Sequence, residues 1–520
     1  MVILLSLPAP AEALLVTTIR TKARRNERYI VAQVAQVAQV AQVALLVLVS
    51  SACGGTGAAT RPPAPGSQAA LAAATASGAD AAVSWSYEVN VDAALDLDVR
   101  ATLHGPFTGG LIVDRAATRY VDGVELAEGD GWRRMGLNDP RWPSACASSC
   151  SLRYHFHLRD AAKAIGDVDI AIVSGGAIFA PPSTWLVRPS DEGAAARYRF
   201  HVTTHAHVRF ATGIRAAARA APDTYEAPIA SLDEAAFSAF GALRVSHLAD
   251  PGIEAAIAPD VRLPDDVLTR WLKSEVDAVT TYFAHPPDGH AMLFIAPGNS
   301  GDTSGKTLGG GGASLLVRLG DKTVSARDLD DDWVFAHELV HVASPDLDRR
   351  YTWFSEGLAT YVEPIARERV GLVKREKVWT DMLEGLPQGL PGPGDGGLDG
   401  TQEWGRTYWG GAVYFFLADV RIRERTRNAM GLEDALRAVV AAGGNVERMW
   451  TLARVLDVGD AATGTKVLRE LYDELGTKRG EVDLEGTFRK LGVRLEGGTV
   501  RFDDRAPLAA VRDAILPPRK

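Results

Sequence analysis

The chain has 520 residues, of which 46% are hydrophobic and 23% are charged, and its formal net charge is -9 at pH 7. This length and composition allow about two or three domains with sizeable cores. The acidic balance argues against a nucleic-acid partner, because proteins that bind nucleic acid usually carry a basic surface.

The first 53 residues have the pattern of an export leader. Basic residues between positions 20 and 28 precede an uncharged run at 29–52. Basic residues followed by an apolar core are typical of an export signal, and the run is also long enough for an uncleaved membrane anchor. The small residues before Cys53 are similar to a bacterial lipoprotein processing site, where that cysteine receives lipid. We expect a protein of the bacterial cell envelope, lipid-anchored at Cys53, with ordinary cleavage or a retained anchor as alternatives.

Residues 54–82 are rich in Gly, Ala, Pro, Ser and Thr, with Arg61 and Asp80 as the only charges. A segment of this composition cannot bury a core, so it predicts a flexible tether. After the tether, polar and apolar residues alternate in several segments, and this period of two predicts a β-rich domain over 83–235. The alternation is found at 84–91, 154–158 and 198–202.

The cysteines agree with export. Besides Cys53, the chain contains only Cys146 and Cys150. In an exported protein such a local pair predicts a disulfide that closes a small loop. The rival interpretation, a pair of thiol metal ligands, lacks a second pair or a histidine at ligand spacing.

Two pairs of alternating histidines lie in the predicted strands, His155 with His157 and His205 with His207. A second metal site at either pair is conceivable. No carboxylate or cysteine at regular spacing accompanies them, so we predict half-exposed strand residues.

From Pro264 the pattern becomes helical, with apolar residues on one side up to Val279. The proline suits the start of a helix, which is therefore predicted here. The apolar run at 291–296 then predicts a buried strand.

The stretch 333–341 sets His337 and His341 four residues apart, with Glu338 between them. Positions i and i+4 are neighbours on a helix, so the two imidazoles can converge on one ion at about 2 Å from each. Glu338 faces the same cleft without being a ligand, and there it can take a proton from the attacking water. The pattern predicts one Zn²⁺ ion with Glu338 as the general base.

A third ligand is expected downstream, at Glu356. Pro345 ends the first helix, and apolar residues then recur at helical intervals, with Ser355 as the predicted cap of a second helix. Glu356 would then lie in the first turn and face His337 and His341. Two histidines and one glutamate leave a fourth zinc position open, which is the arrangement of a catalytic site.

These residues resemble the gluzincin metallopeptidases, in which a second helix carries the ligand glutamate. The sequence WFSEGLATY is most similar to the glycyl aminopeptidase family and more loosely to the aminopeptidase N family. The segment 406–423 resembles the next helix of that family, which opens with a tyrosine and ends in Asp-x-x-Ile-Arg. In relatives this tyrosine donates a hydrogen bond to the oxyanion, and Tyr408 is the matching position. Tyr361 and Tyr414 are the alternatives.

The resemblance and the patterns together predict an α+β fold. An N-terminal β-rich domain is followed by a thermolysin-like catalytic domain with a mostly helical C-terminal part. We place the zinc peptidase subdomain at 236–370 and the helical C-terminal subdomain at 371–520.

Relatives hold substrate on an edge strand before the zinc helix, and the stretch 307–318 occupies that place. The aminopeptidases carry a glutamate in this strand that binds a free amino terminus, whereas here we find glycines and small residues. Aminopeptidase and endopeptidase activity therefore both stay open.

The predicted function is an exported zinc-dependent metallopeptidase that hydrolyses peptides or proteins. The alternative is a catalytically inactive, zinc-bearing binding or scaffold lipoprotein. The presence of Glu338 argues against that alternative, because a structural zinc site needs no base. The sequence gives no prediction of the oligomeric state.

Overall fold

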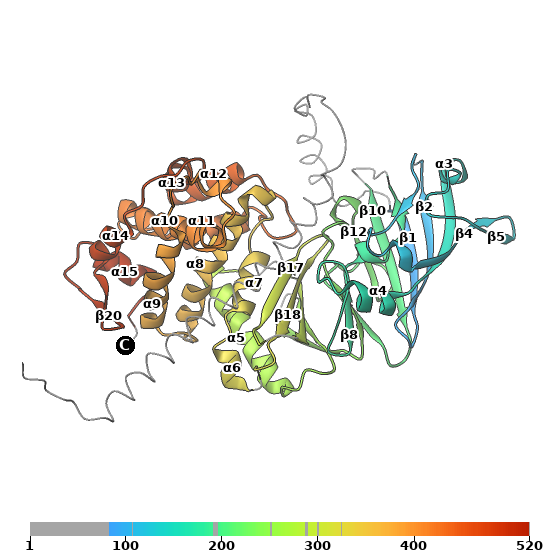
Figure 1. The fold of residues 1–520 in the computed structure, drawn as a ribbon, viewed down its shortest axis with the longest axis horizontal. Helices are drawn as coiled ribbons and strands as arrows, with labels where there is room; N and C mark the ends of the chain where they lie inside the picture. The colour runs from blue at the N-terminus through green and yellow to red at the C-terminus, as the bar shows by residue number, and fades with distance from the viewer. Residues whose placement is uncertain are drawn as a thin grey trace, which may run out of the picture. The chain divides into compact units, whose positions relative to one another are not determined.

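The structure is a computed structural model that describes residues 83–518, except for 107, 191–195, 250–251, 287–289, 299–300 and 324. The predicted leader, with Cys53, and the predicted tether lie outside the described residues. Among the helices of the described part, none is both long and apolar enough to cross a membrane. The order of elements is mixed α+β, with a β-rich region first and a mostly helical part last (Figure 1).

A seven-stranded sheet opens the described chain. Its strands alternate buried and exposed residues, as in β2, and the inward side chains pack into one hydrophobic core. The first strand pairs in parallel with β10 and antiparallel with β2. In spatial order the strands are β12 (Thr224–Pro228), β10 (Arg197–Thr204), β1 (Val83–Val91), β2 (Leu97–His104), β6 (Ser149–Phe156), β4 (Val121–Glu128) and β5 (Gly131–Arg134).

The predicted disulfide between Cys146 and Cys150 is confirmed. Cys146 directly follows the short helix α3 (Trp142–Ala145), and Cys150 lies in β6. Their Cα atoms are 4.9 Å apart, within the span that a disulfide bridges. The bond therefore fixes the turn that leads into β6.

A second, four-stranded antiparallel sheet follows. Its strands are, in spatial order, β11 (Arg209–Thr212), β13 (Ser238–Gly241), β8 (Ala177–Ala180) and β7 (Ile172–Ser174). Two smaller pairs join β3 (Leu111–Ile112) to β9 (Arg188–Pro189) and β19 (Val493–Glu496) to β20 (Thr499–Phe502).

A five-stranded sheet carries the region of the predicted zinc helix. Its three inner strands are parallel, and an antiparallel strand closes each edge. The helix and the buried strand predicted from Pro264 onward are confirmed as α5 (Asp265–Phe283) and β16 (Ala291–Pro297). In spatial order the strands are β14 (Arg244–Ala249), β15 (Ile253–Ile257), β16, β18 (Ala313–Leu319) and β17 (Ser304–Leu308).

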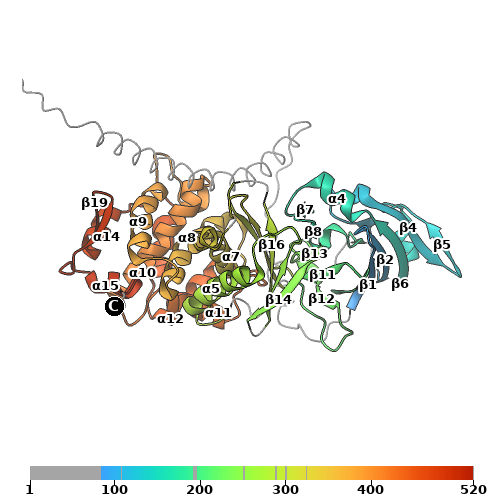
Figure 2. The same cartoon turned by 90° about the horizontal axis from the view of Figure 1, so that it is seen from below.

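Helices cover this sheet and, with the β19–β20 pair, make up most of the chain that follows it. Figures 1 and 2 both show α7 (Val334–Val342) between the five-stranded sheet and α8 (Thr352–Val370), in agreement with its contacts to β17, β18 and α8. The helices not yet placed are α4 (Leu158–Ile165), α6 (Ala326–Asp330), α9 (Arg375–Gly385), α10 (Gly411–Thr426), α11 (Leu432–Ala441), α12 (Leu452–Thr463), α13 (Val467–Leu475), α14 (Leu484–Leu491) and α15 (Ala509–Ile515).

Two glycines let α8 and α10 approach closely. A Cβ atom added to Gly357 would lie 2.3 Å from the Cα of Gly411, and one added to Gly411 would lie 2.0 Å from the carbonyl oxygen of Trp353. Both distances are far shorter than van der Waals contact, so any side chain would push the helices apart. Gly357 belongs to the WFSEGLATY motif and Gly411 to the 406–423 motif, so the two motifs meet here.

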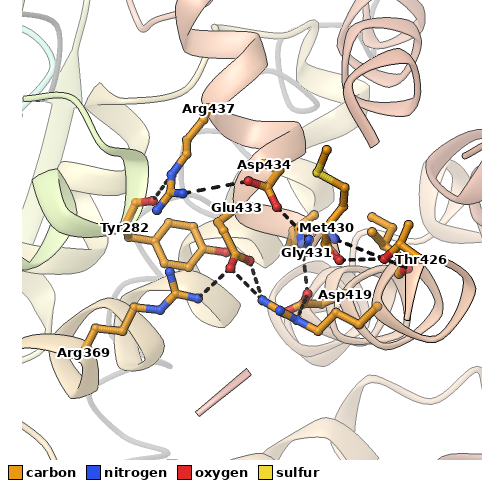
Figure 3. A network of polar contacts seen from close by, with 12 residues as sticks. Tyr282, Arg369, Asp419, Thr426, Met430, Gly431, Glu433, Asp434 and Arg437 are labelled. Carbon is orange, nitrogen blue, oxygen red and sulfur yellow. Dashed lines mark hydrogen bonds and ion pairs between the residues drawn. The ribbon is translucent and has the colours of Figure 1, made fainter. Parts of the chain in front are cut away.

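Buried charges also tie α8 to α10 (Figure 3). Asp419 accepts hydrogen bonds from the Tyr361 hydroxyl at 2.9 Å and from Arg423 Nε at 2.8 Å. Arg423 also donates to Glu433 of α11 at 2.6 Å, and Arg369 of α8 lies 3.2 Å from the same carboxylate. The Asp-x-x-Ile-Arg ending thus supplies an i,i+4 ion pair that holds three helices together.

Candidate metal centre

The predicted helix around the two histidines is confirmed as α7 (Val334–Val342). His337 and His341 lie one turn apart on it, with their ring centroids separated by 5.0 Å. The side chain of His337 is only 3% exposed and that of His341 is 16% exposed. One helical turn therefore holds both imidazoles in a largely desolvated position.

The start of α8 differs from the prediction. The helix begins at Thr352, so Ser355 is inside it and Glu356 lies in the second turn, and the predicted cap at Ser355 is wrong. The reason lies upstream, where the Asp348 side chain accepts the backbone N–H of Arg350 and starts a 3-10 turn. That turn leads directly into α8, so the helix begins earlier in the sequence than predicted.

Glu356 nevertheless faces both histidines. Its Oε2 lies 3.2 Å from His337 Nε2 and 3.6 Å from His341 Nε2. We call His337, His341 and Glu356 the helix cluster. Two ligands of one tetrahedral ion, each about 2 Å from it, lie roughly 3.4 Å apart, so these separations fit a shared ion. Two imidazole nitrogens and one carboxylate oxygen are also donors that zinc accepts.

The histidines and the glutamate of the helix cluster shift one another's pKa values. Burial alone would raise the pKa of Glu356, but the charges and hydrogen bonds of His341 and His337 hold that pKa well below its usual value. Burial alone would lower the pKa of His341, whereas the Glu356 carboxylate raises it overall. The carboxylate is therefore ionised and available as a metal ligand.

Glu338 is also buried, with 5% of its surface exposed. Its Oε2 accepts a hydrogen bond of 2.7 Å from the Thr307 hydroxyl, which also lies 3.2 Å from the Glu338 carbonyl oxygen. A Cβ atom added to Gly305 would lie 2.4 Å from Glu338 Cγ, so only glycine leaves room for this side chain. The strand β17 thus orients the Glu338 carboxylate through Gly305 and Thr307.

The edge strand was predicted to consist of glycines and small residues, which is wrong. The edge is β17 (Ser304–Leu308), and the glycines at 309–312 form the turn between β17 and β18. β17 carries Lys306, whose ammonium lies 3.0 Å from the Asp169 carboxylate. The predicted segment included Thr307 but not Gly305 and Lys306, because a short polar strand has no apolar alternation that would mark it in the sequence.

Tyr408 lies beside the helix cluster. It belongs to a π-helical turn at Arg406–Gly410, a kind of turn that is frequent at functional sites. Its ring stacks against His337 with centroids 6.3 Å apart, and its hydroxyl is near enough to Glu356 for that carboxylate to affect the pKa of Tyr408. Burial, and then the charges of Glu356 and Glu338, raise the pKa of Tyr408 well above its ordinary value, so the hydroxyl keeps its proton.

The two alternative tyrosines have other partners. Tyr361 donates to Asp419, and Tyr414 donates to the carbonyl oxygen of Leu468 at 2.7 Å. Both hydroxyls are buried in the helical core. Tyr408 is therefore the one of the three whose ring contacts a helix-cluster histidine.

The side chains of His155 and His157 are 33% and 40% exposed, as predicted, but the fold also brings a carboxylate beside them that no regular spacing in the sequence indicated. Asp96 precedes β2 in sequence and lies beside both imidazoles in space. We call Asp96, His155 and His157 the strand cluster. The sequence could not reveal it, because the alternation of a strand does not give its pairing register.

No protein-family model and no curated protein matches this chain. Solved structures do resemble it. An aminopeptidase N family protein from Idiomarina loihiensis aligns over 79% of this chain and 79% of its own, with 12% identity and a TM-score of 0.59. An M1 zinc metallopeptidase from Deinococcus radiodurans covers 77% of this chain and 94% of its own, with 16% identity and a TM-score of 0.44. On the first of these alignments, the chain has the fold of an aminopeptidase N family protein.

Proposed function

We propose that this chain is a zinc metallopeptidase of the gluzincin type, most similar to the glycyl aminopeptidase family, with a thermolysin-like catalytic region. The observation that carries the proposal is the convergence of His337, His341 and Glu356 on one point, with Glu338 and Tyr408 beside it. A structural zinc site would need neither the buried base nor the buried hydroxyl. This combination is what peptide hydrolysis requires.

His337, His341 and Glu356 would hold the ion through two nitrogens and one oxygen. When bound, a zinc ion supplies a Lewis acid that polarises the scissile carbonyl and lowers the pKa of the attacking water. The carboxylate of Glu338 would take the proton from that water and pass it to the leaving amine. Thr307 would keep the carboxylate oriented through its 2.7 Å hydrogen bond.

Tyr408 would donate a hydrogen bond from its hydroxyl to the oxyanion that forms when water attacks the carbonyl. Its raised pKa keeps the hydroxyl proton in place at neutral pH. A single donor of this kind contributes about 2.7–4 kcal/mol to a transition state.

The edge strand β17 would bind the substrate backbone. It ends the five-stranded sheet, so its outer side offers N–H and C=O groups to an extended peptide. The peptide would then lie next to Glu338, which contacts the same strand. β17 contains no glutamate that could bind a free amino terminus. Aminopeptidase and endopeptidase activity therefore both stay open, and the test uses aminoacyl and protein substrates.

A Glu338→Gln variant tests this function. We expect turnover of casein or aminoacyl substrates to fall by about 10²–10⁴-fold while the zinc content stays unchanged. The matched control is Glu376→Gln, an exposed glutamate of α9, which should behave as wild type. Full activity of Glu338→Gln would contradict the role of Glu338. Zinc binding without any peptidase activity of the wild type would favour the alternative, an inactive zinc-bearing binding or scaffold lipoprotein.

We also propose export to the bacterial cell envelope and lipid attachment at Cys53. This proposal rests on the basic cluster, the apolar run and the small residues before Cys53. Expression with radiolabelled palmitate tests it, because Cys53→Ser should lose the label and Cys146→Ser should keep it.

A further inference from the structure

The strand cluster lies where β2 begins and the neighbouring strand β6 ends, both within the seven-stranded sheet. β2 and β6 run antiparallel side by side (Figure 2), with Leu97 opposite Phe156 and Asp98 opposite His155. Asp96 is the residue before β2, and His157 is the residue after β6. The pairing register therefore brings Asp96 and His157 to the same place, although they are far apart in sequence.

The donor atoms of the strand cluster have the spacing of metal ligands. Asp96 Oδ2 lies 3.6 Å from His157 Nδ1 and 3.8 Å from His155 Nε2. Both distances are longer than an ordinary hydrogen bond, which has about 2.7–3.2 Å between N and O. They are close to the 3.2 and 3.6 Å between the same atom types in the helix cluster. The three donor atoms are therefore near enough to one another to share one ion.

Neighbouring groups hold each donor in the required orientation. Asp98 Oδ1 lies 3.0 Å from His155 Nδ1, so that nitrogen donates to it, and in the neutral imidazole Nε2 then offers its lone pair to an ion. The backbone N–H of Arg159 donates to Asp96 Oδ1 at 3.2 Å, which leaves Oδ2 for the histidines. A carboxylate behind a histidine and a donor behind a carboxylate are the usual supports of metal ligands.

The other histidine pair of this region serves as an internal comparison. His205 and His207 have ring centroids 5.9 Å apart, against 4.6 Å for His155 and His157. Within the described part of the chain, no third donor atom joins His205 and His207 to make a group of three. Two alternating histidines are therefore insufficient, and the carboxylate of Asp96 makes the difference.

We propose that the strand cluster binds a second divalent ion of the zinc class. Two imidazole nitrogens with one carboxylate favour Zn²⁺, Co²⁺ or Ni²⁺ over Mg²⁺ and Ca²⁺, which prefer oxygen ligands. The side chains of Asp96, His155 and His157 are 21%, 33% and 40% exposed, so the ion can enter and keep water in its remaining positions. Bound there, it links the turn before β2 to the start of α4. The proposal is independent of the peptidase function.

Zinc stoichiometry of the full chain tests the proposal. Protein stripped with a chelator and reloaded with Zn²⁺ is analysed by elemental mass spectrometry and by competition with a zinc-binding dye. We expect the wild type to take up a second equivalent that His155→Ala loses, while His337→Ala loses the other one. His205→Ala is the matched control and should keep both equivalents.

A second variant covers the case in which His155→Ala does not fold. Asp96→Asn keeps an acceptor for the Arg159 N–H but replaces the anionic ligand, so the second equivalent should still be lost. A zinc content that His155→Ala and Asp96→Asn leave at the wild-type value overturns the proposal. Failure of the peptidase proposal would appear separately, as an equivalent that His337→Ala does not remove.

Discussion

The helix cluster and the strand cluster have the same donors, two histidines and one carboxylate, in different surroundings. The helix cluster lies between α7 and α8, where its side chains are 3–21% exposed, with Glu338 and Tyr408 beside it. The strand cluster lies at the ends of β2 and β6, is about a third exposed, and contacts Asp98 and the Arg159 backbone. The donor set therefore predicts that an ion binds, and the surroundings decide what the ion can do.

Burial explains the difference in chemistry. In a desolvated site each charge acts more strongly, because less water screens it. Glu338 is held against the β17 backbone, where a proton acceptor is useful to a substrate bound along that strand. An ion at the strand cluster would be more exposed to water, which would screen its effect on neighbouring charges.

The largest expected effect comes from removing metal. Incubation with a chelator should release the ion of the exposed strand cluster first, and activity should stay constant during this phase. Activity should then fall completely as the buried helix cluster empties, and Zn²⁺ should restore it, because the Lewis acid is essential. Zinc release and peptidase activity are followed in the same sample. Loss of activity together with the first ion released would contradict the assignment of catalysis to the buried cluster.

The next effect concerns the scaffold of the helix cluster. Asp419→Ala removes the acceptor of Tyr361 and one of the two carboxylates paired with Arg423, which should lower the free energy of unfolding by about 1–3 kcal/mol because buried donors lose a partner. Urea-induced unfolding measures it. Asp266→Ala, which breaks an exposed pair with Arg270, is the control and should cost about 0–1 kcal/mol. Zinc binding at the strand cluster should be unchanged, and equal effects of the two variants would refute this account.

Tyr408→Phe separates binding of the ion from its chemistry. The variant keeps the ring that stacks on His337 but loses the hydroxyl, so kcat should fall by about 10²–10³-fold with unchanged zinc content. Steady-state kinetics and zinc analysis check this. Tyr414→Phe is the control on α10 and should leave kcat at the wild-type value. A wild-type kcat for Tyr408→Phe would mean that Tyr408 does not stabilise the oxyanion.

The smallest expected effect is in the strand cluster. Asp98→Asn leaves the three donors in place but weakens the support of His155 Nδ1, so affinity for the second equivalent should fall by about 10–100-fold. Dye competition measures the affinity, and peptidase activity should not change. An unchanged affinity would mean that Asp98 does not orient His155.

Much of the helix cluster could be predicted from the sequence. The spacing of His337 and His341 fixes their relation on a helix, and the motif around Glu356 indicates the third donor. The disulfide between Cys146 and Cys150 follows from a local pair with a short loop. Each of these predictions depends on residues close together in the chain, where helix geometry or loop length limits the possible positions.

The remaining features depended on which distant segments pair in the fold. Thr307 reaches Glu338 because the edge strand β17 packs against α7. Asp96 reaches His157 because of the register between β2 and β6. α8 begins earlier than predicted because the Asp348 side chain stabilises a turn directly before it. The sequence by itself determined the local donors and their spacing. The tertiary structure decided their supports, because strand register and edge position arise from contacts between residues that are distant in sequence.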